Sequence, residues 1–152
     1  MTFAARRHAL VVLAGVGLAA AAFAVGPGAT GVARAQDPRA ADVQRAAREW
    51  LAMTDRFDSI GSREAAGKRF KEAMTADEWS LALRRERSPL GTQEQRTLLQ
   101  TLFEKSFGGL PEGEYALVSF RSAYSSRPEV RETVTLERET DGRWRVIGYF
   151  LR

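Results

Sequence analysis

The residues that carry most enzyme and metal chemistry are almost absent from this sequence. It contains no cysteine, and its one histidine, His8, lies close to the start of the chain. Beyond that point there is no thiol nucleophile, no imidazole acid or base, and no ligand set that zinc or copper favours. The acid–base groups left are carboxylates and tyrosines, of which Asp55, Asp58, Tyr124 and Glu132 are the candidates. We therefore expect no catalytic residue, no metal site and no cofactor.

Arginine and aromatic side chains offer a different chemistry, which is binding. Trp79, Arg84 and Arg87 occur at helical spacing, and two guanidiniums beside an aromatic ring can hold a carboxylate or a phosphate. In the alternative interpretation, Trp79 belongs to the core and the arginines are solvated at a helix end, where the helix dipole favours positive charge. Tyr124 and Tyr149 add two amphipathic rings on expected strands. The predicted ligand-binding residues are Trp79, Arg84, Arg87, Tyr124 and Tyr149.

These candidates lead to a structural expectation that separates binding from catalysis. We expect no buried carboxylate–tyrosine pair, and we expect a pocket, where one exists, to be lined by at least two of the five binding candidates. A deep pocket centred on Asp55 or Asp58, with a strongly raised pKa, would favour an enzyme instead. The mixed charges of 129–139, including Glu132, fit solvated strand faces and edges.

The N-terminal segment has the features of an export signal. Arg6 and Arg7 precede an uncharged apolar run over 9–25, and Ala33 and Ala35 place small residues where signal peptidase reads them. An uncleaved membrane helix is the alternative, but the run is short and is followed by glycine and proline. We expect a signal peptide over 1–35, a cut before Gln36, a single domain over 36–152, and a periplasmic or extracellular location.

Removal of that segment changes the charge balance. The full chain carries a net charge of +4, but loss of Arg6, Arg7 and Arg34 leaves 20 basic and 19 acidic residues. Such a balanced domain lacks the electrostatic footprint of a nucleic-acid-binding protein. We expect no nucleic-acid partner, and no membrane association after cleavage.

Hydrophobic periodicity predicts three helices in the first half of the domain. Apolar residues recur every three or four residues over 38–57, which indicates an amphipathic helix. A second helix over 63–74 would begin at Ser62 as its N-cap. Thr75 and Glu78 form a capping box for a third helix that ends near Arg87, before Pro89.

The second half of the domain reads as strands. Residues 115–124 and the alternating run from Val130 to Leu136 are typical of strands, and Asp141 with Gly142 predicts a hairpin turn before the strand 144–151. In that last strand, 144, 146, 148 and 150 would share one face, with 145, 147, 149 and 151 on the other. Both faces are apolar, which indicates a central or doubly covered strand. The spacing of 95–107 fits helix slightly better than strand.

Five segments together resemble an exported bacterial family called domain of unknown function 4019. They are 79–83 (WSLAL), 87–91 (RSPLG), 111–115 (PEGEY), 132–136 (ETVTL) and 141–150 (DGRWRVIGYF). The resemblance covers about 50–151 and implies a cone similar to the nuclear-transport-factor-2-like fold. It also implies that 95–107 is the first long strand. The expected fold class is α+β, with three N-terminal helices on a curved antiparallel sheet of about four strands.

The resemblance implies no activity, so function is open. Our preferred expectation is an exported accessory domain that binds a partner protein or small ligand in the bacterial envelope, with a homodimer as a further possibility. The alternatives are a small pocket enzyme of isomerase or hydrolase type, using carboxylate and tyrosine, and a purely structural envelope protein.

Overall fold

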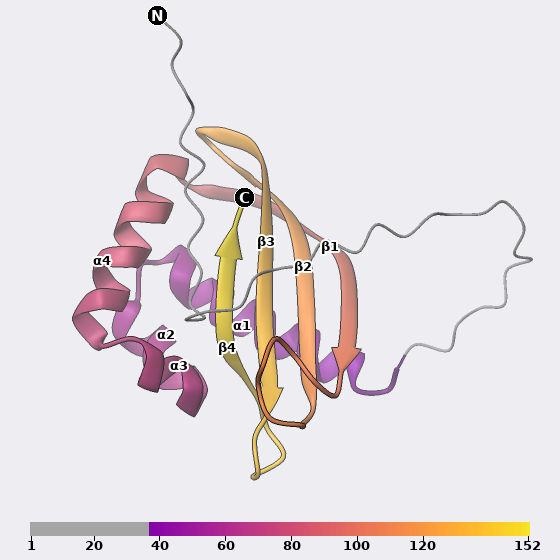
Figure 1. Cartoon of the computed structure of the whole chain (residues 1–152). Helices are drawn as coiled ribbons and strands as arrows, with labels where there is room; N and C mark the ends of the chain where they lie inside the picture. Colours follow the sequence, from indigo (N-terminus) through magenta and orange to yellow (C-terminus); the bar gives the residue numbers. More distant parts are fainter. Residues whose placement is uncertain (1–36) are drawn as a thin grey trace, which may run out of the picture.

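The computed structural model describes residues 37–152, so the expected signal peptide and its cleavage site lie outside the described residues. Helices come first and a four-stranded sheet follows, as the α+β prediction required. Figure 1 shows the curved sheet with α1 running behind it and α2, α3 and α4 gathered at one side. We call the sheet face that packs on α1 the inner face and the opposite face the outer face.

Helix α1 (Ala40–Asp55) confirms the predicted amphipathic helix to within two residues at each end. Its buried residues, including Val43, Ala47 and Trp50, follow the predicted apolar face. Gln44 Nε2 donates a 3.0 Å hydrogen bond to Thr101 Oγ1, which attaches the helix to the sheet. After the helix, Phe57 adopts a φ of 57°, and the N–H groups of residues 57 and 58 donate back to Thr54 and Met53.

The predicted second helix is wrong, because two short helices replace it. They are α2 (Ser59–Ala65) and α3 (Lys68–Ala73), separated by extended backbone at Ala66 and Gly67. Gly67 N–H donates a 2.8 Å hydrogen bond to the Val146 carbonyl oxygen of the sheet, and a helical backbone could not make that contact. The N-cap of α2 is Asp58, which accepts from Gly61 N–H at 2.8 Å, whereas Ser62 is buried inside the helix.

Helix α4 (Ala76–Arg87) confirms the predicted third helix. Thr75 and Glu78 form the capping box in both directions, with Glu78 Oε2 accepting from Thr75 N–H at 2.8 Å. A single turn of 3₁₀ helix, η1 (Ser88–Leu90), carries the chain toward the sheet.

The sheet contains β1 (Gln93–Glu104), β2 (Tyr115–Tyr124), β3 (Arg127–Arg138) and β4 (Trp144–Leu151). All neighbours are antiparallel, in the order β1-β2-β3-β4. Strand β1 confirms the strand that the family resemblance implied for 95–107. Leu99 is an extra residue that interrupts the pairing of β1 with β2. Because of this bulge, the adjacent residues Leu98 and Leu99 break the alternation of apolar and polar residues that is typical of a strand.

The predicted faces of β4 are wrong, and of the two predicted positions, central or doubly covered, the central one is wrong. Residues 146, 147 and 149 are nonetheless at most 2% exposed. Thr135 pairs with Gly148 and Leu136 with Val146, so Ile147 is an extra residue in β4. This bulge reverses the alternation and places Trp144 and Val146 on the inner face, together with Tyr149 and Leu151. The strand lies at one edge of the sheet, where the Gly67 contact covers part of that edge.

The predicted hairpin between β3 and β4 is present, with a different turn. Of its two central residues only Gly142 has a positive φ, of 77°. Gly142 N–H donates to the Glu139 carbonyl, and Glu139 N–H donates to the Arg143 carbonyl. The loop is therefore a three-residue loop with glycine at its left-handed position.

The inner face of the sheet and the helices enclose one hydrophobic core. Trp50, Phe70 and Trp79 pack on one another, with ring centroids 5.1–5.9 Å apart. Trp50 also contacts the Tyr149 ring at 5.3 Å, which joins this aromatic group to the sheet. The candidate site lies beside this core.

Candidate functional site

Polar side chains from six elements meet inside the domain, between the sheet and the ends of α1 and α4. Arg87 and Asp55 are the last residues of their helices, and the others come from the four strands. We call this group the buried cluster: Asp55, Arg87, Arg96, Ser122, Tyr124, Glu132 and Tyr149.

Glu132 is the centre of the buried cluster, and its side chain is 0% exposed. Its Oε1 accepts from Arg87 Nη1 at 3.0 Å, Tyr124 Oη at 2.8 Å and Tyr149 Oη at 2.6 Å. Its Oε2 accepts from Arg96 Nε at 2.7 Å and Ser122 Oγ at 2.5 Å. Five donors therefore occupy the two oxygens of this carboxylate.

Asp55 completes the charge balance of the buried cluster. Its carboxylate accepts from Arg96 Nη1 at 2.8 Å and Nη2 at 2.9 Å, and it also contacts Arg87 Nη2. Two guanidiniums thus face two carboxylates. Within residues 37–152, every buried side-chain nitrogen or oxygen has a hydrogen-bond partner.

The electrostatics keep Glu132 ionised. Burial alone would raise its pKa, but the Arg96 and Arg87 guanidiniums and the Ser122 hydroxyl outweigh burial and lower the pKa to about 2. Burial and the neighbouring Glu132 charge raise the pKa of Tyr124 and of Tyr149. A carboxylate this acidic and this fully hydrogen-bonded is a poor general base, and these tyrosines hold their protons.

The expectation that no carboxylate–tyrosine pair would be buried is wrong. Glu132 binds two buried tyrosines, because its strand position faces the core rather than solvent. The pair does not form a reaction site, however, since Glu132 is closed off from any substrate. The other acid–base candidate, Asp58, caps α2. The buried cluster acts chemically as a cross-link between elements.

The structure separates the five predicted binding residues. Arg87, Tyr124 and Tyr149 converge on Glu132, whereas Trp79 lies in the core and donates to Ser62 Oγ at 3.0 Å. Arg84 is exposed on α4 and lies 3.3 Å from Ser80 Oγ. Four of the five are at most 2% exposed, which puts them out of reach of a ligand in this conformation. Their ligand-binding role stays a prediction.

The position of Glu132 in the sequence could have indicated the buried cluster, but the mixed charges of 129–139 suggested a solvated strand instead. Val130, Val134 and Leu136 mark the core face of β3, and Glu132 falls in the same phase. A carboxylate in a core phase needs charged or hydrogen-bonding partners. Arg96 gave no such signal, because the spacing of 95–107 fits helix slightly better than strand and so does not place Arg96 on a sheet face.

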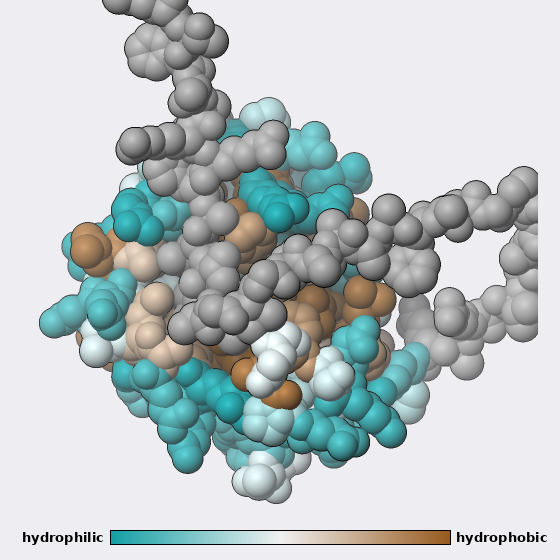
Figure 2. Space-filling view, viewed as in Figure 1, coloured by the Kyte–Doolittle hydropathy of each residue, from teal (hydrophilic) through white to brown (hydrophobic). Residues whose placement is uncertain are grey.

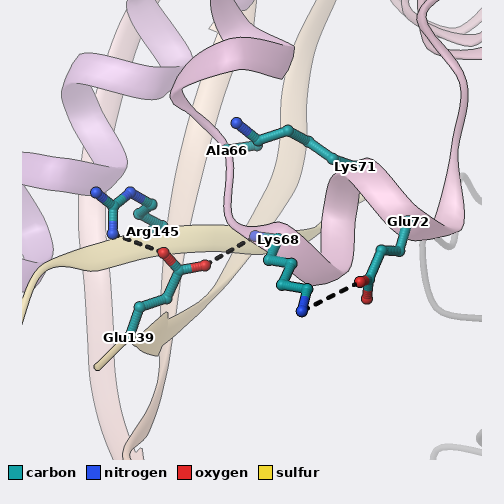
Figure 3. Close-up of a pocket in the computed structure, with 6 residues that line it drawn as sticks. All are labelled: Ala66, Lys68, Lys71, Glu72, Glu139 and Arg145. Carbon is teal, nitrogen blue, oxygen red and sulfur yellow. Dashed lines mark hydrogen bonds and ion pairs between the residues drawn. The ribbon is translucent and has the colours of Figure 1, made fainter. Parts of the chain in front are cut away.

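A surface hollow with a volume of about 420 Å³ lies where α3 meets the β3–β4 hairpin, and none of the five predicted residues lines it (Figure 3). Glu139 lies between Arg145 Nη1, at 2.6 Å, and Lys68 N–H, at 2.8 Å. Lys68 Nζ is 3.6 Å from Glu72 Oε1. The charges of the hollow are therefore largely matched from within the protein. Its lining residues are Ala66, Lys68, Lys71, Glu72, Glu139 and Arg145.

The outer face of the sheet is the other candidate site. Cross-strand pairing forms two consecutive rows without a charged residue, which we call the neutral stripe: Gln100, Ser119, Thr133 and Phe150, then Leu102, Leu117, Thr135 and Gly148. Leu102 is 45% exposed, and Leu99 at the adjacent bulge is 42% exposed. Where no grey residues cover this face, Figure 2 shows hydrophobic side chains near its middle and mostly hydrophilic ones toward the strand ends.

No cluster of acidic or histidine side chains in residues 37–152 could hold a metal ion. None of the helices in that part of the chain is long and apolar enough to cross a membrane.

The chain belongs to the family described as "Protein of unknown function (DUF4019)", whose model matches residues 46–149. This confirms the resemblance drawn from the sequence motifs. No curated protein and no solved structure matches the chain. The cone similar to nuclear transport factor 2 is therefore not confirmed, whereas the helices on a curved antiparallel sheet are present.

Proposed function

We propose that this protein is an exported accessory domain of the bacterial envelope that binds a partner protein through the outer face of its sheet. Export is inferred from the charged, apolar and small-residue pattern of residues 1–35. Binding is preferred over catalysis because the polar groups with the strongest interactions are closed inside the buried cluster.

The observation that carries this proposal is the neutral stripe. Sheets covered on one side normally present polar residues to water on the other. Here two full rows of that face lack charge, Ser119 and Thr135 at their centre are only 6% exposed, and the exposed leucines lie at the β1 edge. Depletion of charged residues beside exposed apolar ones is typical of the core of a protein interface.

The small pocket enzyme is the second candidate, because a carboxylate does lie beside two tyrosines. A reaction at Glu132 would require the domain to open between α1, α4 and the sheet. It would also require a base with a pKa far above the value of about 2 that its arginine neighbours impose. The geometry thus favours the binding proposal.

The test is affinity capture from the envelope fraction with the domain over 36–152 as bait. The double variant Leu99→Ser/Leu102→Ser should lose a partner that the wild type retains. Ile60→Ser/Leu81→Ser is the matched control, because these residues are 75% and 69% exposed on helices. Equal capture by all three baits would refute the outer face as the binding surface.

A homodimer and a small ligand are the other occupants to distinguish. Light scattering of the purified domain reports a dimer directly, and the same leucine variants should then dissociate it if the outer face is the dimer interface. Binding of a small ligand would be independent of Leu99 and Leu102 and would contradict the proposed surface.

A further inference from the structure

Three arginines form a row on the outer face, from β2, from β3 and from the residue that directly follows β4. Arg121 pairs directly with Arg131 across β2 and β3. Arg131 and Arg152 exchange both backbone hydrogen bonds, each 2.9 Å long. Directly opposite residues in a sheet share a face, and core residues alternate with Arg121 and Arg131 on their strands. All three therefore project from the outer face, next to the neutral stripe.

These arginines differ from most others in the described part of the chain. All three are exposed, and none lies within 4.0 Å of a carboxylate there, whereas Arg39, Arg69 and Arg145 each form ion pairs. Glu129, two residues before Arg131 on the same face, forms no ion pair with the row either. Like charges placed directly opposite one another destabilise a sheet. Arg152 lies over the Phe150 ring, 5.1 Å from its centroid, but no carboxylate of the described residues balances the three charges. A negatively charged partner would balance them.

We propose that the arginine row (Arg121, Arg131 and Arg152) is an anion-binding site for an acidic segment of the partner protein. This inference rests on the proposed function, since it names the chemistry of the partner that the outer face binds. The three backbone positions span about 10 Å, because paired residues lie about 5 Å apart. Each guanidinium can bind one carboxylate through two parallel hydrogen bonds.

An acidic protein segment fits this surface better than a small phosphate does. The arginines are spread along a row instead of converging on one point, so a single phosphate group would engage only part of the row. The neutral stripe continues directly from the row, because Ser119 and Thr133 lie two residues from Arg121 and Arg131. A chain with carboxylates followed by uncharged or apolar residues would cover both surfaces at once.

The experiment titrates the domain over 36–152 with a short peptide of alternating glutamate and serine, beside its glutamine counterpart. The wild type should bind the glutamate peptide more tightly than the glutamine peptide. Arg121→Gln/Arg131→Gln should weaken binding of the glutamate peptide about tenfold, from the loss of two charge-assisted contacts. Arg56→Gln/Arg143→Gln removes the same charge from exposed sites elsewhere and should change the affinity less than twofold.

Several results would overturn the inference. An equal loss of affinity for the glutamate peptide in both double variants would show an effect of net charge alone. Equal affinity of the wild type for the two peptides would show that no carboxylate is recognised. Tighter binding of inorganic triphosphate at the same arginines would assign the row to phosphate. A dimer that dissociates in Arg121→Gln/Arg131→Gln would assign it to a second copy.

Envelope capture keeps this inference separate from the proposed function. If the leucine variant loses the partner and the arginine variant keeps it with unchanged affinity, the outer face stands and the acidic segment is wrong. If neither variant loses it, the proposed function itself fails. We expect the arginine variant to stay folded. Removing two like charges that lie directly opposite each other should leave it at least as stable as the wild type.

Discussion

Glu132 shows how one residue can determine the character of a site. A carboxylate on the core face of a strand is costly unless other groups neutralise and hydrogen-bond it. Here two arginines and three hydroxyls do so, and in return they hold β1, β2, β4 and α4 to β3. The same contacts that stabilise the charge remove its reactivity, so the buried cluster is part of the structure of the domain.

The hydroxyl of Tyr149 tests this structural role. It donates to Glu132 Oε1 at 2.6 Å and lies 2.5 Å from Arg87 Nη1. Tyr149→Phe should lower the free energy of unfolding by about 2 kcal/mol, because hydrogen bonds to charged groups are lost in a buried site. Tyr115→Phe is the matched control, since its hydroxyl bonds only a loop carbonyl at Pro111, and it should cost less. Equal urea midpoints for Tyr149→Phe and the wild type would show that the cluster does not stabilise the fold.

The ionisation of Glu132 predicts a pH dependence with a definite sign. Its pKa falls from 4.5 to about 2 on folding, so the folded state binds fewer protons than the unfolded state between these values. Its contribution, on the order of 3 kcal/mol, is complete above about pH 4.5 and is lost as the pH falls toward 2. Urea denaturation at a series of acidic pH values and NMR titration of the Glu132 carboxyl carbon measure this. Titration of that carbon near 4.5 would contradict the arginine pairing.

Phe57 presents a different question at the residue scale. It follows α1 at the position where helices usually place glycine, with a φ of 57° that is unfavourable for a bulky side chain. Phe57→Gly should raise the free energy of unfolding by about 1 kcal/mol through relief of that conformation. Phe57 is 42% exposed, so little packing is lost. A lower urea midpoint would instead show that the ring contributes more than its backbone costs.

At the scale of elements, α4 depends on its capping box. Thr75 Oγ1 accepts from Glu78 N–H at 3.3 Å, and Glu78 accepts from Thr75 N–H at 2.8 Å. Thr75→Ala should cost about 1 kcal/mol, because backbone donors at the start of the helix lose their partner. Thr140→Ala, in the exposed β3–β4 turn, is the control and should change the melting temperature little. An unchanged melting temperature for Thr75→Ala would mean that the cap is not used.

Local signals in the sequence predicted the elements that are decided locally. The capping box located α4, and apolar periodicity located α1, because both depend on residues within a few turns. The break between α2 and α3 had no such signal, since it arises from the bond between Gly67 and Val146, which are far apart in sequence. Tertiary contact overrode the local pattern there.

The same reasoning explains the errors in the strands and in the site. The bulge at Ile147 depends on the pairing of β4 with β3, so the sequence of β4 alone gave the wrong faces. The buried cluster draws on residues from Asp55 to Tyr149, and its direct contacts join residues up to 62 positions apart, Arg87 and Tyr149, so that neither partner suggests the other. Arg87, Tyr124 and Tyr149 were predicted as ligand-binding residues, and in the structure all three bind Glu132.

At the scale of the whole molecule, the two faces of the sheet have different roles. The inner face carries the core and the buried cluster, which closes the space between helices and sheet. The outer face carries the neutral stripe and the arginine row, and neither contributes to that core. This division places stability on one side of the sheet and the proposed binding on the other.

The affinity of the captured partner for the outer-face variant tests this division most directly. We expect the Kd of the partner for Leu99→Ser/Leu102→Ser to rise at least about tenfold, because two exposed apolar side chains would lose their contacts with the partner. Tyr149→Phe, which weakens the fold from the inner face, should leave the Kd within about twofold at a temperature where it is folded. The account is contradicted if the leucine variant binds as tightly as the wild type, or if only the loss of the Tyr149 hydroxyl abolishes binding.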